Sequence, residues 1–264
     1  MKHEILSHLP GDIPWQVQYY DTIDSTNDRA KALAAQGAPH GTVLIADQQT
    51  GGRGRMGRSF SSPAGLGIYL SVLLRPKCHA RDMMHLTCAA AVAMCDAVQK
   101  TTGFRPGVKW INDLIADGKK LGGILTELSV TPDSGQASHA IVGIGINCCQ
   151  KPADFPEDIR DIAVSLETAT GQKIDRHRLA AAMINALWEM DGKLLTQKAS
   201  VMEAYAKDCI TLGKEVILHR NEQTFCGTAM NIDPDGGLLI RLTDGTVQTV
   251  NSGEVSVRGM YGYV

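Results

Sequence analysis

A short segment rich in arginine and glycine is the part of this sequence best suited to chemistry. It occupies residues 51–58, reads GGRGRMGR, and follows the apolar run 43–46 (VLIA), which is typical of a buried strand. Glycines give the backbone conformational freedom, and arginines bind phosphate and carboxylate groups. We therefore expect this segment, the Arg-Gly loop, to close over an anionic ligand.

The glycine spacing of the Arg-Gly loop also matches the G-x-G-x-x-G pattern of dinucleotide-binding folds. That pattern requires a helix directly after the glycines, with its N-terminus facing the pyrophosphate. Residues 59–67 read SFSSPAGLG, and the proline and glycines oppose a helix there. An Arg-Gly tract that binds nucleic acid would usually repeat, whereas this one occurs once. We reject both alternatives and retain a cationic loop.

Lys109 is a second candidate for chemistry. It precedes Trp110 in a predicted strand that runs into a tight turn. An ammonium held in a cleft can stabilise the charge on a phosphate or carboxylate during acyl transfer. Taken alone, Lys109 is better interpreted as a surface lysine. The Arg-Gly loop and the glycine-bearing strand 140–147 in the same chain favour a role in a site.

Polar residues at predicted element ends complete the candidate set. Ser25, Thr26 and Asn27 lie at a strand-to-helix junction, where Ser25 or Thr26 is a natural N-cap. A cap uses one of the three side chains and leaves the others to bind a polar head group. Gln49 is interpreted as a turn residue or a ligand contact, and Asn147 as a helix cap or a ligand contact.

The elements that position these residues follow from apolar periodicity. The residues Asp117-Gly118 predict a hairpin. Gly143 and Gly145 remove side chains from one face of their strand, as happens where a ligand or another backbone comes close. The strands are expected at 15–20, 43–46, 67–74, 108–115, 120–128 and 140–147, and the helices at 29–36, 81–100 and 178–195.

The pattern changes near residue 213, where short strands replace the alternation of strands and helices. Turn sequences separate these strands, which is typical of a small β-barrel. We expect two domains, residues 13–212 and residues 213–264. The strands of the second are predicted at 215–219, 224–230, 238–242, 246–250 and 254–257.

Composition narrows the functional class. The net charge of −2 gives no global attraction to nucleic acid or to an anionic membrane. The seven cysteines are scattered and match no zinc motif, and free thiols fit a reducing compartment. No signal peptide or membrane-spanning run is present, so we expect a cytoplasmic protein. Cys148-Cys149 has no cationic neighbour in sequence, which argues against a nucleophilic thiolate.

Together these segments resemble the biotin–protein ligases, also called biotin–[acetyl-CoA-carboxylase] ligases, from about Tyr19 to Arg258. Three positions depart from the family pattern without removing a catalytic group: Ile111 replaces a proline, Gly51 an alanine, and Phe60 a tryptophan. The matching motifs are STN at 25–27, QTGGRGRMGR at 49–58, VKWIND at 108–113, KLGGIL at 120–125, GIGIN at 143–147 and GEVSVR at 253–258.

The resemblance implies an α+β fold. A mixed sheet flanked by helices, as in class II aminoacyl-tRNA synthetases and biotin synthetases, would carry a small C-terminal SH3-like β-barrel.

The resemblance also implies an ATP-dependent, AMP-forming ligase. The biotin carboxylate would attack the α-phosphate of ATP with Mg²⁺, giving biotinyl-5′-AMP and pyrophosphate. A lysine of a biotin carboxyl carrier protein would then attack the adenylate, giving an amide and AMP.

The resemblance also assigns site residues. Lys109 and Arg55 would be catalytic, and a lid formed by Arg53 and Arg55 would keep water from the adenylate. The metal ligands are unknown. The expected biotin-binding residues are Ser25, Thr26, Asn27, Gln49, Arg53, Gly54, Arg55 and Lys109. The expected ATP- and adenylate-binding residues are Arg53, Arg55, Arg58, Phe60, Asn147 and Arg258.

Partners and alternatives complete the prediction. About 18 residues precede the matching region, too few for a winged helix-turn-helix, so we expect a monofunctional ligase that does not bind operator DNA. We also expect no membrane partner, and a homodimer is possible. The alternatives are a lipoate– or octanoate–protein ligase of the same fold and a non-catalytic, biotin-responsive regulator. The Arg-Gly loop, Lys109-Trp110 and the C-terminal strands favour biotin ligation.

Overall fold

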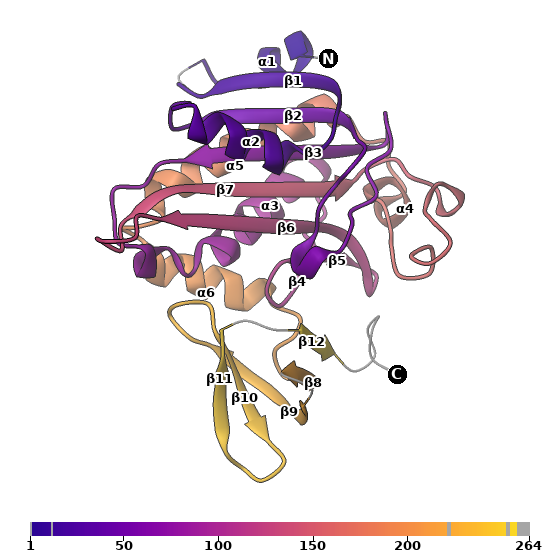
Figure 1. Cartoon of the computed structure of the whole chain (residues 1–264). Coiled ribbons are helices and arrows are strands. Elements are labelled where there is room, and N and C mark those ends of the chain that lie inside the picture. The colour runs from indigo at the N-terminus through magenta and orange to yellow at the C-terminus, as the bar shows by residue number, and fades with distance from the viewer. Residues whose placement is uncertain (1, 12, 221–222, 252–253, 258–264) are drawn as a thin grey trace.

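A seven-stranded mixed sheet forms the centre of the molecule. The computed structural model describes residues 2–11, 13–220, 223–251 and 254–257. The strand order is β1-β2-β3-β7-β6-β5-β4, with β1 and β2 parallel and the other neighbours antiparallel (Figure 1). The predicted strands are confirmed, except that the segment expected as one strand at 108–115 forms two, β4 and β5, with a turn at 110–112 between them. Their bounds are β1 (Gln16–Ile23), β2 (Thr42–Gln49), β3 (Gly67–Leu74), β4 (Gly107–Lys109), β5 (Asp113–Ala116), β6 (Lys119–Val130) and β7 (Ala137–Asn147).

Helices cover both faces of this sheet. In Figure 1, α2 lies on one face, and α3 and α5 lie on the other, with α6 beside α3. The three predicted helices are confirmed as α2, α3 and α5, whereas α1, α4 and α6 were not predicted. No side chain caps the N-terminus of α6, so its start carries little sequence signal. The helices are α1 (Lys2–His8), α2 (Thr26–Ala35), α3 (Leu86–Thr102), α4 (Leu166–Thr170), α5 (Arg176–Lys193) and α6 (Lys198–Asp208).

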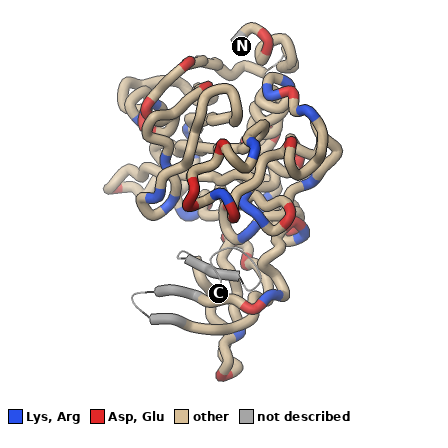
Figure 2. Tube along the Cα trace, turned by 90° about the vertical axis from the view of Figure 1, so that its right-hand side faces the viewer, with Lys and Arg blue, Asp and Glu red and all other residues tan. Residues whose placement is uncertain are grey.

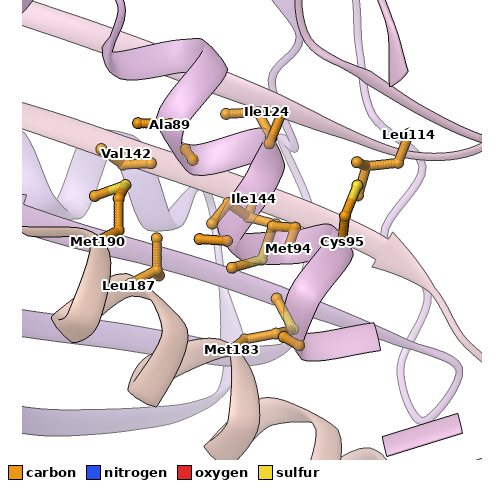
Figure 3. Close-up of a cluster of buried hydrophobic side chains, with 14 of the residues drawn as sticks. Ala89, Met94, Cys95, Leu114, Ile124, Val142, Ile144, Met183, Leu187 and Met190 are labelled. Atoms are coloured by element: carbon orange, nitrogen blue, oxygen red, sulfur yellow. The ribbon is translucent and has the colours of Figure 1, made fainter. Parts of the chain in front are cut away.

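The core divides into a large layer and a small one. Alternate residues of β3 and β7 pack against α3 and α5, where Met94 of α3 meets Ile144 of the sheet (Figure 3). On the opposite face Ala30 and Ala34 of α2 contact Leu44, Leu73 and Ile141. These alanines let α2 lie close to the sheet. Because α2 is short, part of this face stays free of helix.

Five short antiparallel strands form a second sheet, as predicted for the C-terminal segment. Their order is β11-β10-β9-β8-β12. This sheet lies beside the end of the larger sheet that carries β4 and β5 (Figure 1). The strands are β8 (Glu215–Arg220), β9 (Gln223–Ile232), β10 (Leu238–Leu242), β11 (Val247–Val250) and β12 (Glu254–Val257).

Trp110 connects the two sheets. Its indole N–H donates to the carbonyl of Gly236 at 2.9 Å, and its backbone N–H donates to the Thr211 hydroxyl at 2.9 Å. The Trp110–Ile111 peptide is cis. The segment that carries Lys109 is therefore fixed by contacts from the C-terminal part of the chain. Among the described residues, no helix has the length and apolar character needed to cross a membrane.

Substitution of Gly236 tests this contact between the sheets. Gly236 has φ +90°, and a Cβ there would lie 2.8 Å from the Cys88 sulfur. Gly236→Ala should lower the free energy of unfolding by about 2–4 kcal/mol, because backbone strain and overpacking add. Gly245 has φ +86° and open space around it, so Gly245→Ala should cost only about 1 kcal/mol. Urea unfolding measures both, and equal losses would contradict the packing argument.

Candidate functional site

The candidate site is a cavity on the glycine-bearing face of β7. A Cβ at Gly143 would lie 1.9 Å from Asn27 Oδ1, and one at Gly145 would lie 2.5 Å from the Phe60 ring. Both glycines therefore make room for side chains from other elements, whereas the sequence had predicted the close approach of a ligand or another backbone. The cavity holds about 480 Å³, counting the space at its open mouth. Its walls come from Ser25, Thr26, Asn27, Gln49, Arg53, Gly54, Arg55, Phe60, Asn112, Lys120, Gly123, Ile124, Leu125, Gly143, Ile144 and Gly145.

A largely buried hydrogen-bond network, which we call the polar floor (Thr26, Asn27, Gln49 and Ser71), lies at the base of the cavity. Gln49 Oε1 accepts from the Thr26 backbone N–H at 2.9 Å and from its hydroxyl at 3.0 Å. Ser71, which is fully buried, lies 2.8 Å from the Thr26 hydroxyl and donates to Asn27 Oδ1 at 2.6 Å. Satisfied buried polar groups hold one arrangement, so the polar floor is preorganised.

The sheet topology explains how the polar floor assembles. Parallel pairing of β1 with β2 aligns Ile23 with Gln49, which brings the start of α2 beside the end of β2. Ser25 caps α2 by accepting from the Asp28 backbone N–H, as predicted. The cap leaves Thr26 and Asn27 directed at the cavity, while Gln49 also donates to the Ser62 hydroxyl at 2.9 Å. Gln49 is thus a network member rather than a simple turn residue.

The Arg-Gly loop forms a narrow hairpin at the cavity. The Phe60 N–H donates to the Gly52 carbonyl at 2.9 Å, and the Gly54 N–H donates to the Arg58 carbonyl at 2.7 Å. Met56 turns the hairpin with a left-handed φ of 55°. In the described segment 58–66 the chain forms no helix, which agrees with rejecting the dinucleotide pattern.

Three cationic side chains reach the cavity, each with a partner. Arg55 donates to Asn112 Oδ1 at 3.1 Å, and Lys120 pairs with Asp113 at 2.7 Å. Arg53 pairs with carboxylates beside the cavity, one of which is Asp28. Basic and acidic positions are interspersed over the part of the chain that contains the larger sheet (Figure 2). The charges of Arg53 and Lys120 are balanced by carboxylates, whereas Arg55 has an amide partner and adds positive charge to the cavity.

Several predicted site residues lie outside the cavity lining. Lys109 ends β4, is 8% exposed, and has its backbone paired with Asp113. The Asn147 amide donates to the Val164 carbonyl at 3.1 Å and accepts from Gln150 at 3.3 Å, so it fixes the segment after β7. Arg58 is exposed on the hairpin, and Arg258 lies outside the described residues.

Sequence reasoning missed two polar residues of the cavity wall, Asn112 and Lys120. Both belong to motifs that the sequence contains, VKWIND and KLGGIL. Lys109 was selected from the first motif, whereas Asn112 and Lys120 line the cavity. The sequence signal that could have found them is their position in the predicted hairpin: the Asn112 amide directly precedes β5, and the Lys120 ammonium lies near the start of β6.

The paired cysteines are poorly suited to nucleophilic catalysis. Burial raises the pKa of the Cys149 thiol to about 11, and the pKa of the more deeply buried Cys148 also rises. A thiolate is therefore scarce at neutral pH. Within the described part of the chain, no cluster of three or more His, Cys, Asp or Glu side chains could hold a metal ion.

Comparison with known proteins gives matches along most of the chain. Residues 19–147 match the Biotin/lipoate A/B protein ligase family, and residues 211–258 match the Biotin protein ligase C terminal domain. The bifunctional ligase/repressor BirA of Bacillus subtilis is 35% identical, over 90% of this chain and 73% of its own. The biotin–[acetyl-CoA-carboxylase] ligase of Mycobacterium tuberculosis is 32% identical, over 88% of this chain and 85% of its own.

Solved structures show the same similarity. The biotin protein ligase from Aquifex aeolicus, in complex with biotin and ATP, superposes with a TM-score of 0.77 and 31% identity. That alignment covers 92% of this chain and 98% of the other. The resemblance therefore extends over both sheets.

Removal of the Ser71 hydroxyl tests the polar floor. Ser71→Ala removes the buried hydroxyl that donates to Asn27 Oδ1 and leaves that oxygen without its donor, so the free energy of unfolding should fall by about 1–3 kcal/mol. Ser138 lies exposed in β7, and Ser138→Ala should change stability by less than about 0.5 kcal/mol. Thermal and urea unfolding compare the two variants. A Ser71→Ala protein as stable as the Ser138→Ala control would show that the network is not needed.

Proposed function

This chain belongs to the biotin protein ligase family, and on that premise we propose that its cavity binds biotin and the adenylate made from it. The chain is a biotin–[acetyl-CoA-carboxylase] ligase that uses ATP. The observation that supports the site is convergence: Thr26 and Asn27, at the start of α2, meet Gln49 and Arg55 from a later segment of the chain in one cavity. We assign the polar end of biotin to the polar floor.

The chemistry requires stabilised charge rather than a covalent nucleophile. When the biotin carboxylate attacks the α-phosphate of ATP, negative charge develops on the phosphoryl oxygens as pyrophosphate leaves. Arg55 and Lys120 at the cavity wall, and Lys109 at the end of β4, are the cations that would stabilise it. Positively charged groups held by existing hydrogen bonds need little reorganisation during the reaction.

The second step needs access for an amine and exclusion of water. A lysine of a biotin carboxyl carrier protein would attack the carbonyl of biotinyl-5′-AMP, forming an amide and releasing AMP. The Arg-Gly loop is suited to cover the adenylate between the two steps. Phe60 sits against Gly145 at the wall and offers a ring face or edge for the adenine.

Magnesium fits this site as a companion of ATP. Mg²⁺ keeps several waters and usually takes one or two carboxylates together with substrate phosphates. Asp113, which is paired with the wall residue Lys120, is the carboxylate that would help hold it. When bound, the ion would neutralise phosphate charge, while Arg55 and the lysines orient the α-phosphate.

A substrate comparison tests the proposed function. Pyrophosphate release should occur with ATP and biotin, and should stay near background with lipoate or octanoate in place of biotin. The polar floor explains the choice, because a ureido group can satisfy donors and acceptors that an alkyl or dithiolane end cannot. Turnover with lipoate and none with biotin would contradict the proposed function and assign lipoate ligation to this chain instead.

Lys109 is tested by truncation. We expect Lys109→Ala to lower biotin-dependent pyrophosphate release by roughly two to four orders of magnitude, which is the usual cost of removing a preorganised charge stabiliser. Lys119 is exposed at the start of β6 and serves as a control, since Lys119→Ala should keep its activity. Adenylation by Lys109→Ala at the rate of that control would remove Lys109 from the mechanism.

A further inference from the structure

One carboxylate connects the polar floor to the Arg-Gly loop. Glu127 Oε2 accepts from Asn27 Nδ2 at 2.9 Å. Its other oxygen, Oε1, lies 3.4 Å from Arg53 Nη2 and 2.5 Å from Lys31 Nζ. Glu127 does not line the cavity, although Asn27 and Arg53 both do. The residue therefore acts on the site through its neighbours.

The position of Glu127 follows from the fold. It lies on β6 opposite Ile141 of β7, on the face that α2 covers. Asn27 and Lys31 are four residues apart on α2, so both project toward the same region of the sheet. The missing side chain at Gly143 lets Asn27 approach closely enough to reach Glu127.

The surrounding charges form a balanced cluster. Arg53 also pairs with Asp28, and Lys31 lies 3.5 Å from the same Asp28 oxygen. Two carboxylates thus face two cations, and both side chains of the Glu127–Arg53 pair are partly shielded, at 25% and 39% exposure. These ion pairs attach Arg53 to β6 and to α2. Because Arg53 lies at the base of the Arg-Gly loop, they also hold the base of the loop.

A carboxylate is also what fixes the Asn27 amide. Glu127 can only accept, so Asn27 must present its NH₂ group to it. The Leu125 carbonyl, at 3.3 Å, favours the same orientation, while Asn27 Oδ1 accepts from Ser71. A glutamine at position 127 could still accept from Asn27, but it would bring no negative charge to Arg53.

We propose that Glu127 is a positioning residue that sets the Asn27 amide and the base of the Arg-Gly loop together. Ligand contact at Asn27 and placement of Arg53 are then coupled through one side chain. The identity of the ligand as biotin rests on the proposed function, whereas the coupling itself rests on the contacts of Glu127.

Trypsin provides a direct test, because the loop contains the cleavage sites Arg53, Arg55 and Arg58. Without ligand, Glu127→Gln should be cut at these sites several-fold faster than wild type, with nearly the same melting temperature. Mass spectrometry of the fragments identifies the sites. The KM of Glu127→Gln for biotin in pyrophosphate release should rise roughly tenfold, because Asn27 then bonds to a neutral acceptor and Arg53 loses a charged partner, while kcat changes less.

Two further variants separate the roles. Lys31→Met keeps the Glu127 carboxylate for Arg53 and Asn27, so its loop should be cut no faster than that of wild type. Asp28→Asn removes the other carboxylate partner of Arg53 but leaves the Asn27 contact intact. It should speed loop cleavage with a smaller rise in KM for biotin, and it keeps the test available if Glu127→Gln folds poorly.

The outcomes distinguish this inference from the proposed function. Wild-type cleavage rates in both Glu127→Gln and Asp28→Asn, with an unchanged KM for biotin, would overturn the coupling and leave the ligase activity standing. Failure of the wild-type protein to release pyrophosphate with biotin would overturn the proposed function. In that case, cleavage of the ligand-free proteins still decides whether Glu127 positions the loop.

Discussion

The absence of side chains at Gly143 and Gly145 is the constraint on which the site depends. Sheet faces are normally filled by alternating side chains, and the other face of β7 is closely packed against α3 and α5 in that way. On the glycine face the space is taken by Asn27 from α2 and Phe60 from the segment after the Arg-Gly loop. Three parts of the chain that are distant in sequence can therefore meet at one cavity.

Polar groups brought so close to a sheet need hydrogen-bond partners, and this requirement determines which residues surround Asn27 and Thr26. Ser71, on the same face of the sheet, serves both Thr26 and Asn27, and Glu127 supplies the remaining acceptor. The resulting network leaves little freedom to the polar floor, which suits selective binding of a small polar head group. The cationic loop then adds charge where an adenylate would form.

The sequence predicted more of the fold than of the contacts. Strong local signals, such as the run 67–74 and the Asp117-Gly118 turn, identified β3 and the hairpin of β5 and β6. The uncapped α6 carried no such signal. Asn147 stood at the right end of a strand, yet its amide bonds to Val164 and Gln150, partners that only the folded chain places nearby. Glu127 gave no signal at all, because its role depends on α2 crossing the glycine face.

Calorimetric titration of biotin into Gly143→Ala protein tests the central claim most directly. The added methyl group would occupy the place of Asn27 Oδ1 and displace the polar floor. Gly192 lies in α5 with open space around it, so Gly192→Ala is the matched control. We expect wild type and the control to bind biotin with equal affinity and the folded Gly143→Ala protein to lose at least tenfold. Wild-type affinity in Gly143→Ala would contradict the assignment of this cavity to biotin.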